Sequence, residues 1–158
     1  MSDASRPIAL TARDVPAQLG TSYPPEFAER VVGRRKQRLG DVFGLDTFGV
    51  NLVTLPPGSQ SSIRHRHTVQ DEFVYVLAGE LVLVHDGGET LLAAGACAGF
   101  QHGGTAHHLI NRSGADASFL EVGDRLPGDT AEYPEDDLVA VRRGTGWRYT
   151  RRNGEPYP

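Results

Sequence analysis

The stretch that decides the fold is Gly58-Ser-Gln-Ser-Ser-Ile-Arg-His65-Arg-His67-Thr-Val-Gln-Asp71-Glu72, which continues through Phe73-Val-Tyr-Val-Leu-Ala to Gly79. It places two histidines and a carboxylate between strand-like segments. Side chains two residues apart on a strand share one face, so His65 and His67 can bind one ion. Imidazole together with carboxylate suits Fe, Mn, Ni, Cu or Zn. The stretch therefore predicts a metal site built on β-strands.

The parity of the strand decides which carboxylate joins the histidines. His67 and Glu72 are five residues apart, so on an uninterrupted strand their side chains would face opposite sides. If residues 68–71 form a connecting loop, Glu72 begins the next strand and can turn inward. If the strand continues without a break, Asp71 is the inward carboxylate. We favour Glu72 and keep Asp71 as the alternative.

Two glycine-and-histidine patterns in this chain resemble those of the cupin superfamily of small β-barrels. The first pattern is matched by Gly58, His65, His67, Glu72 and Gly79. The second is matched by Gly95, Gly103, His107 and Asn111. The chain departs from the patterns by an extra residue after Gly58, by Gln101 in place of a proline, and by an extra residue before His107. None of these departures falls on a ligand position.

The resemblance implies an all-β fold, a double-stranded β-helix or jelly-roll barrel, with N- and C-terminal extensions. It also implies that His107 is the fourth metal ligand. Neighbouring residues on a strand point in opposite directions, so His108 is the alternative to His107. We favour His107 because it keeps the family's spacing to Asn111. The flanking sequence resembles a largely uncharacterised group of single-domain bacterial cupins.

The chain divides into three parts by its pattern of apolar runs and turn residues. Residues 1–47 are expected to form an N-terminal arm and edge segment, 48–123 the barrel core, and 124–158 a C-terminal extension with a final hairpin at Asn153-Gly154. Within these parts, short apolar runs separated by Gly, Pro or Asp predict strands. The predicted strands are 48–55, 72–78, 80–85, 89–93, 107–111 and 118–122.

Composition limits the classes of partner. The chain has 158 residues, enough for one domain with a single β core, and its lone Cys97 cannot form an internal disulfide. The net charge of −4 gives no overall basic surface for nucleic acid. The basic run at residues 34–38 is interpreted as a solvated loop or edge strand. No leader peptide or membrane-spanning run is recognisable, so we expect a cytoplasmic protein without nucleic-acid or membrane partners.

A metal held by His65, His67, Glu72 and His107 would keep one or two coordination positions open. We therefore expect a metal-dependent enzyme, of dioxygenase, isomerase or lyase type, acting on a small oxygen-containing organic molecule. Glu72 is expected to double as a proton acceptor, with Ile63 and Val74 as pocket neighbours. The alternative is a non-catalytic module that binds or senses a sugar or an organic acid. The metal is one divalent transition ion: Fe, Mn, Zn, Ni or Cu.

A homodimer is also expected. The β-prone segments at both ends of the chain would otherwise leave sheet edges exposed.

Overall fold

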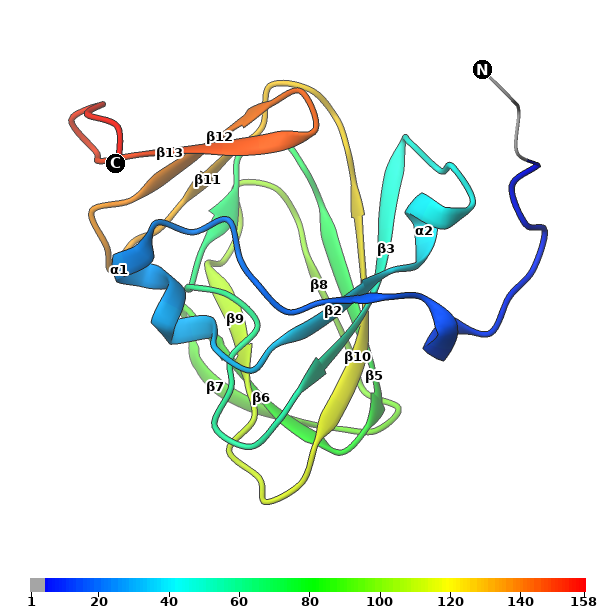
Figure 1. Ribbon diagram of the computed structural model, residues 1–158. Helices are drawn as coiled ribbons and strands as arrows, with labels where there is room; N and C mark the ends of the chain where they lie inside the picture. The colour runs from blue at the N-terminus through cyan, green and yellow to red at the C-terminus, as the bar shows by residue number, and fades with distance from the viewer. Residues whose placement is uncertain (1–4) are drawn as a thin grey trace.

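The structure is a computed structural model that describes residues 5–158, and most of its regular elements are strands (Figure 1). The helical segments are short: η1 Ala12–Asp14, α1 Pro25–Ala28, η2 Glu29–Val31 and α2 Leu39–Val42. The strands are β1 Ala17–Gln18, β2 Arg35–Arg38, β3 Phe48–Leu55, β4 Arg66–His67, β5 Glu72–Ala78, β6 Glu80–His85, β7 Gly88–Ala93, β8 Cys97–Phe100, β9 His107–Ile110, β10 Ala117–Asp124, β11 Thr130–Glu132, β12 Val139–Arg143 and β13 Gly146–Thr150.

The strands form three antiparallel sheets arranged as a jelly roll. The largest sheet has the order β1-β2-β3-β10-β5-β8, and a three-stranded sheet β7-β6-β9 packs against it. A third sheet, β13-β12-β11-β4, joins the C-terminal strands to β4 and lies across one end of the barrel (Figure 1). The all-β jelly-roll prediction is confirmed. No helix within residues 5–158 is long and apolar enough to cross a membrane.

The inner face of the largest sheet is apolar at one end and polar at the other. At one end, inward side chains such as Leu55, Val76 and Phe119 are fully buried and pack against Leu81, Leu83, Leu92 and Leu109 from β6, β7 and β9. At the other end the same rows continue with Asn51, Glu72 and Glu121. Because side chains alternate with a period of two, one unbroken face supplies both the apolar core and a polar layer above it.

The motif glycines make turns that other residues tolerate poorly. Gly58, Gly79, Gly95 and Gly103 all have positive φ, between 69° and 90°. At Gly79, an added Cβ would also lie 2.7 Å from the Asp116 carbonyl oxygen. The Gly103 N–H donates to the His67 carbonyl at 2.7 Å, which ties the second motif to the first. The glycines therefore fix the approach of the strands that carry the histidines.

Asn111 joins three segments through its side chain. It is fully buried, and its Nδ2 donates to the carbonyls of Leu55 at 2.8 Å and Ala115 at 2.7 Å. Its Oδ1 accepts from the Ser113 N–H at 2.9 Å. We predict that Asn111→Ala lowers the free energy of unfolding by about 2 to 4 kcal/mol, because it leaves buried carbonyls without donors.

Chemical denaturation measures this loss, with Asn153→Ala in the exposed final turn as the matched control. The control is expected to cost about 1 kcal/mol or less. Equal losses in the two variants would show that the buried Asn111 contacts do not hold these segments together. The three-part division of the chain at residues 47 and 123 stays a prediction.

Candidate metal centre

The four predicted ligand residues come from three neighbouring strands. β4 ends at His67 and β5 begins at Glu72, so the chain breaks between them and the Glu72 side chain turns inward. His65 lies opposite His107, the first residue of β9, and their backbones exchange two hydrogen bonds of 3.1 and 2.8 Å. His65, His67 and Glu72 therefore come together around one point, and His107 lies beside Glu72.

The facing atoms of this cluster lie within a few ångströms. The two Nε2 atoms of His65 and His67 are 3.2 Å apart. The Glu72 carboxylate lies 3.2 Å from His67 Nε2, 3.8 Å from His65 Nε2 and 2.8 Å from His107 Nε2. His65, His67 and Glu72 each offer a ligand atom within 4.8 Å of the other two, so this group could hold a metal ion.

Hydrogen bonds on the far side of each ring orient the imidazoles. His65 Nδ1 donates to the Ile63 carbonyl at 2.8 Å, and His67 Nδ1 bonds the Asp129 carboxylate at 2.6 Å. A carbonyl only accepts, so His65 Nδ1 carries the hydrogen and Nε2 keeps a free lone pair. The His107 ring is stacked on Phe100, with ring centroids 3.4 Å apart and an interplanar angle of 2°.

A cation fits the space where these atoms meet. The free lone pair of His65 Nε2 and the Glu72 carboxylate face the same space, with His67 Nε2 beside them. Glu72 Oε2 is buried and has no hydrogen bond of acceptable geometry. Such a buried acceptor is costly unless a proton or metal compensates it. The donor set of imidazole and carboxylate is one that divalent transition ions bind.

Charge in the cluster is set by burial and by these contacts. Burial lowers the pKa of His65 to about 4, so its ring is neutral. Burial acts to raise the pKa of Glu72, but the imidazoles of His107 and His67 hold it well below its usual range. For His67, burial is outweighed by Asp129 and Glu72, which raise its pKa to about 10. Two ionised carboxylates therefore flank His67, which favours a positive charge there.

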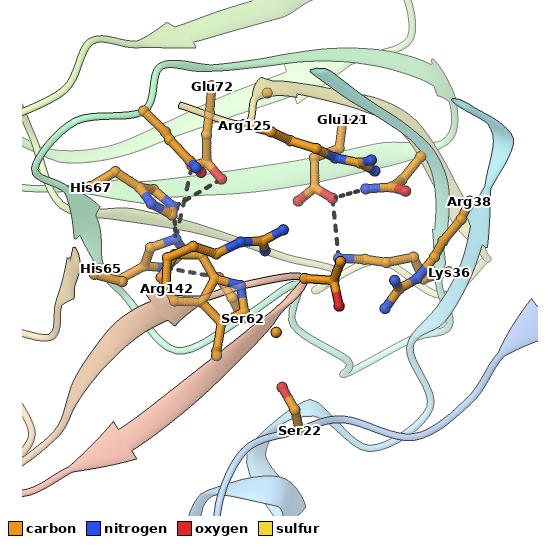
Figure 2. Close-up of a pocket in the computed structure, with 18 of the residues that line it drawn as sticks. Ser22, Lys36, Arg38, Ser62, His65, His67, Glu72, Glu121, Arg125 and Arg142 are labelled. Carbon is orange, nitrogen blue, oxygen red and sulfur yellow. Dashed lines mark hydrogen bonds and ion pairs between the residues drawn. The ribbon is translucent and has the colours of Figure 1, made fainter. Parts of the chain in front are cut away.

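The cluster lies in the wall of a cavity of about 740 Å³ (Figure 2). Polar residues of the largest sheet line one side of the cavity, including Asn51 and Glu121. Tyr133, Trp147 and Tyr149, which lie in or near the C-terminal strands, line the other side. The cavity is large enough for a small organic molecule.

Asp71 and His108, the alternative metal ligands that the sequence left open, lie away from the cluster. Asp71 is exposed, and its Oδ1 accepts from the backbone N–H of His102 at 2.8 Å. His108 follows His107 on β9 and pairs with Val84, so its ring points to the opposite face from His107. Ile63 and Val74 do not line the cavity. The expectation that they are pocket neighbours is wrong, because both side chains are packed inside the apolar clusters.

Sequence reasoning missed Asp129, which bonds His67 from behind the cluster, and Glu121, which lines the cavity. Asp129 is fully buried, bonds His67, and accepts from the N–H groups of Val69 and Gln70 at 2.9 and 3.2 Å. It is 62 residues from His67 in the chain, so no local spacing signalled the contact. Glu121 follows two residues after Phe119 on the inward face of β10. An acidic residue within an apolar strand was the signal that could have identified it.

Comparison with known proteins agrees with this architecture. A family model described as the Cupin domain matches residues 51–123. The chain belongs to the cupin superfamily and is a single-domain member. A search of the curated proteins finds no match.

Among solved structures, a sugar phosphate isomerase from a cupin superfamily, from Silicibacter pomeroyi, is 43% identical, with 95% of this chain and 96% of that chain covered and a TM-score of 0.90. A protein from Acidithiobacillus ferrooxidans, given provisionally as a sugar phosphate isomerase, is 28% identical, with 92% of each chain covered and a TM-score of 0.78. A polyketide cyclase from Streptomyces resistomycificus is 22% identical over 73% of this chain and 78% of that chain, with a TM-score of 0.61, and shows the shared fold alone.

Proposed function

We propose that this protein is a metal-dependent isomerase acting on a small sugar-derived molecule. The observation that carries the proposal is the imidazole and carboxylate cluster in the wall of a cavity of about 740 Å³. The likeness to the Silicibacter pomeroyi protein, over nearly the whole chain, supports isomerisation over the dioxygenase and lyase reactions that the sequence also allowed.

In this proposal His65, His67, Glu72 and His107 hold one divalent transition ion. When bound, such an ion polarises a carbonyl or hydroxyl oxygen of the substrate. The aromatic side chains of Tyr133, Trp147 and Tyr149 cover one wall of the cavity. The choice among Fe, Mn, Zn, Ni and Cu stays open to measurement.

Isomerisation of a sugar moves a proton between neighbouring carbons, so it needs an acid–base group beside the substrate. Glu72 was the predicted proton acceptor, and it keeps that role here only if the ion binds it loosely. Glu121 is the better placed group, because it lines the cavity without contacting the histidines. Its Oε2 accepts from Asn51 Nδ2 at 3.0 Å and pairs with Lys36 Nζ at 3.2 Å.

The contacts of Glu121 hold its side chain in the cavity as a carboxylate. Burial acts to raise its pKa, and Lys36 offsets this, so that the pKa is lowered overall. The ammonium of Lys36 keeps the carboxylate ionised and ready to accept a proton. A partly buried pair of opposite charges that lines a cavity is the kind of arrangement found at functional sites.

Proton NMR in D₂O tests the proposal. The protein is loaded in turn with each of the five metals and incubated with a panel of aldoses, ketoses and their phosphate esters. We expect deuterium to enter the substrate next to the carbonyl, together with formation of the isomer. Binding of a sugar without deuterium incorporation under any metal would overturn the isomerase and leave the non-catalytic binding module.

We also propose that the protein forms a homodimer, as the sequence suggested. The outer face of the largest sheet is apolar across three strands, with Val50 and Leu52 on β3, Leu120 and Val122 on β10, and Phe73, Tyr75 and Leu77 on β5. The three β5 side chains are 40 to 44% exposed. An antiparallel sheet that faces water usually carries polar residues there, so a second copy of the same face is the occupant we propose.

The double variant Tyr75→Glu, Leu77→Glu is therefore expected to elute at half the mass of the wild type in size-exclusion chromatography with light scattering. Leu126→Glu, at an exposed apolar residue in a loop, is the control and is expected to keep the wild-type mass. A wild type that runs as a monomer at all concentrations would refute the dimer. The cytoplasmic location stays a prediction.

A further inference from the structure

Three arginines enter the cavity from three different elements. Arg38 ends β2, Arg125 follows β10, and Arg142 lies in β12. All three line the cavity, and Figure 2 shows their side chains among the residues that surround it. Residues that are distant in sequence are thus brought to one place by the pairing of the strands.

Asp41 is the carboxylate that forms ion pairs with these arginines, and Asp129 acts on Arg142 from farther away. Asp41 lies 2.5 Å from Arg125 and 3.8 Å from Arg38. Asp46 and Asp124 also line the cavity, but within residues 5–158 neither forms an ion pair with an arginine. Two of the three guanidinium groups therefore share one ion-pair partner, and the third has none among the described residues.

Arg142 is the arginine with the most unused donors. Its Nε donates to the Gly144 carbonyl at 3.2 Å, and it has no ion-pair partner among the described residues. Its guanidinium lies over the Trp147 ring, 5.4 Å from the centroid, which holds it in the cavity wall. Burial lowers the pKa of Arg142, the nearby Arg125 and Arg38 also lower it, and the Asp129 carboxylate acts in the opposite direction.

The largest sheet leaves room for the guanidinium of Arg125 because it carries a glycine at residue 49. Gly49 on β3 faces the cavity, and a Cβ added there would lie 3.4 Å from the Arg125 guanidinium. The absence of a side chain lets that guanidinium lie close against the strand. A place where several guanidinium groups converge with spare donors suits an oxyanion, which accepts from several donors at once.

We propose that Arg142, together with Arg38 and Arg125, binds a phosphate group of the substrate, while the sugar part reaches the metal cluster. Phosphate is favoured over carboxylate because it offers more acceptor oxygens to guanidinium groups that converge from three elements. The position of the sugar rests on the proposed function. The phosphate subsite itself does not depend on turnover.

The test is isothermal titration of inorganic phosphate into the metal-loaded wild type and into variants. Arg142→Met is expected to weaken phosphate binding by about tenfold or more, because it removes charge-assisted hydrogen bonds. Arg142→Lys keeps the charge but not the forked arrangement of N–H donors. Its phosphate affinity is expected to lie between those of the wild type and Arg142→Met. Arg112→Met is the matched control, since Arg112 is exposed and paired with Glu89 outside the cavity. Its affinity should equal that of the wild type.

A second comparison separates the arginines from the metal as the place where phosphate binds. In the double variant His65→Ala, His67→Ala, phosphate binding is expected to persist, and adding Arg142→Met should then abolish it. The subsite is refuted if Arg142→Met binds phosphate as tightly as Arg112→Met does, or if phosphate binding disappears with the histidines alone. Melting curves of each variant verify that the fold is kept.

The experiments distinguish failure of the proposed isomerase from failure of the phosphate subsite. If no sugar or sugar phosphate is isomerised but phosphate binding depends on Arg142, the isomerase is wrong and the subsite stands. If unphosphorylated sugars are isomerised and phosphate does not compete, the isomerase stands and the subsite is wrong.

Discussion

Replacing Glu121 by glutamine is expected to lower kcat for the isomerisation by about 10²- to 10⁴-fold, the usual contribution of a general acid–base group. Glutamine keeps the size of the side chain and can still bond Asn51, but it cannot take a proton from the substrate. The substrate KM and the metal content are expected to stay near wild type, because Glu121 does not contact the histidines. Initial rates and deuterium incorporation measure the effect.

Glu80→Gln is the control, since Glu80 is exposed at the start of β6 and does not line the cavity. A Glu121→Gln variant with at least half of the wild-type kcat would remove Glu121 from the reaction. In that case Glu72, the acceptor predicted from the sequence, would become the leading candidate again. A parallel rise in KM with an unchanged kcat would instead assign Glu121 to substrate binding.

The second large effect is expected at Asp129, where asparagine should weaken metal affinity by about 10- to 100-fold, as such supporting residues commonly do. The Asp129 carboxylate accepts from His67 Nδ1 at 2.6 Å and holds the ring with Nε2 toward Glu72. An asparagine amide group turned toward His67 would donate, and would favour the other tautomer. Competition with a chromophoric chelator measures the affinity.

Asp116→Asn is the matched control for Asp129→Asn, because Asp116 is exposed in the loop before β10. Its metal affinity should not change. Wild-type affinity in the Asp129→Asn variant would show that the Asp129 contact does not support the metal group. Loss of affinity together with a lower melting temperature of the metal-free protein would point to a structural role instead.

The strands of the barrel could largely be predicted from local sequence. The runs 48–55, 72–78 and 80–85 coincide with β3, β5 and β6, because each is short, apolar and ended by a turn residue. β8 and β11 were missed, since Cys97–Phe100 and Thr130–Glu132 are too short to show alternation. β2 was left open as a loop or edge strand, because its four polar residues become a strand only by pairing with β3.

The cluster around His65 could be predicted because its residues are close in the chain or recur in a family pattern. The residues that line the cavity around this cluster could not be predicted in this way. Glu121 and Arg142, which line the cavity, and Asp129, which bonds His67, come from β10 and the segments after it. They are brought near the cluster only through pairings such as Glu121 with Val74 and Ala131 with His67. Such long-range register leaves no trace in local spacing. Residues 1–4 of the predicted N-terminal arm lie outside the described residues.

The metal content of the purified untagged protein tests the central claim most directly. Mass spectrometry of the elements is predicted to find about one equivalent of Fe, Mn, Ni, Cu or Zn in the wild type, as expected for one imidazole and carboxylate site. The His65→Ala, His67→Ala variant is predicted to hold none while keeping its fold. A wild type that holds no metal after incubation with each ion, or a variant that binds it equally, would contradict the account.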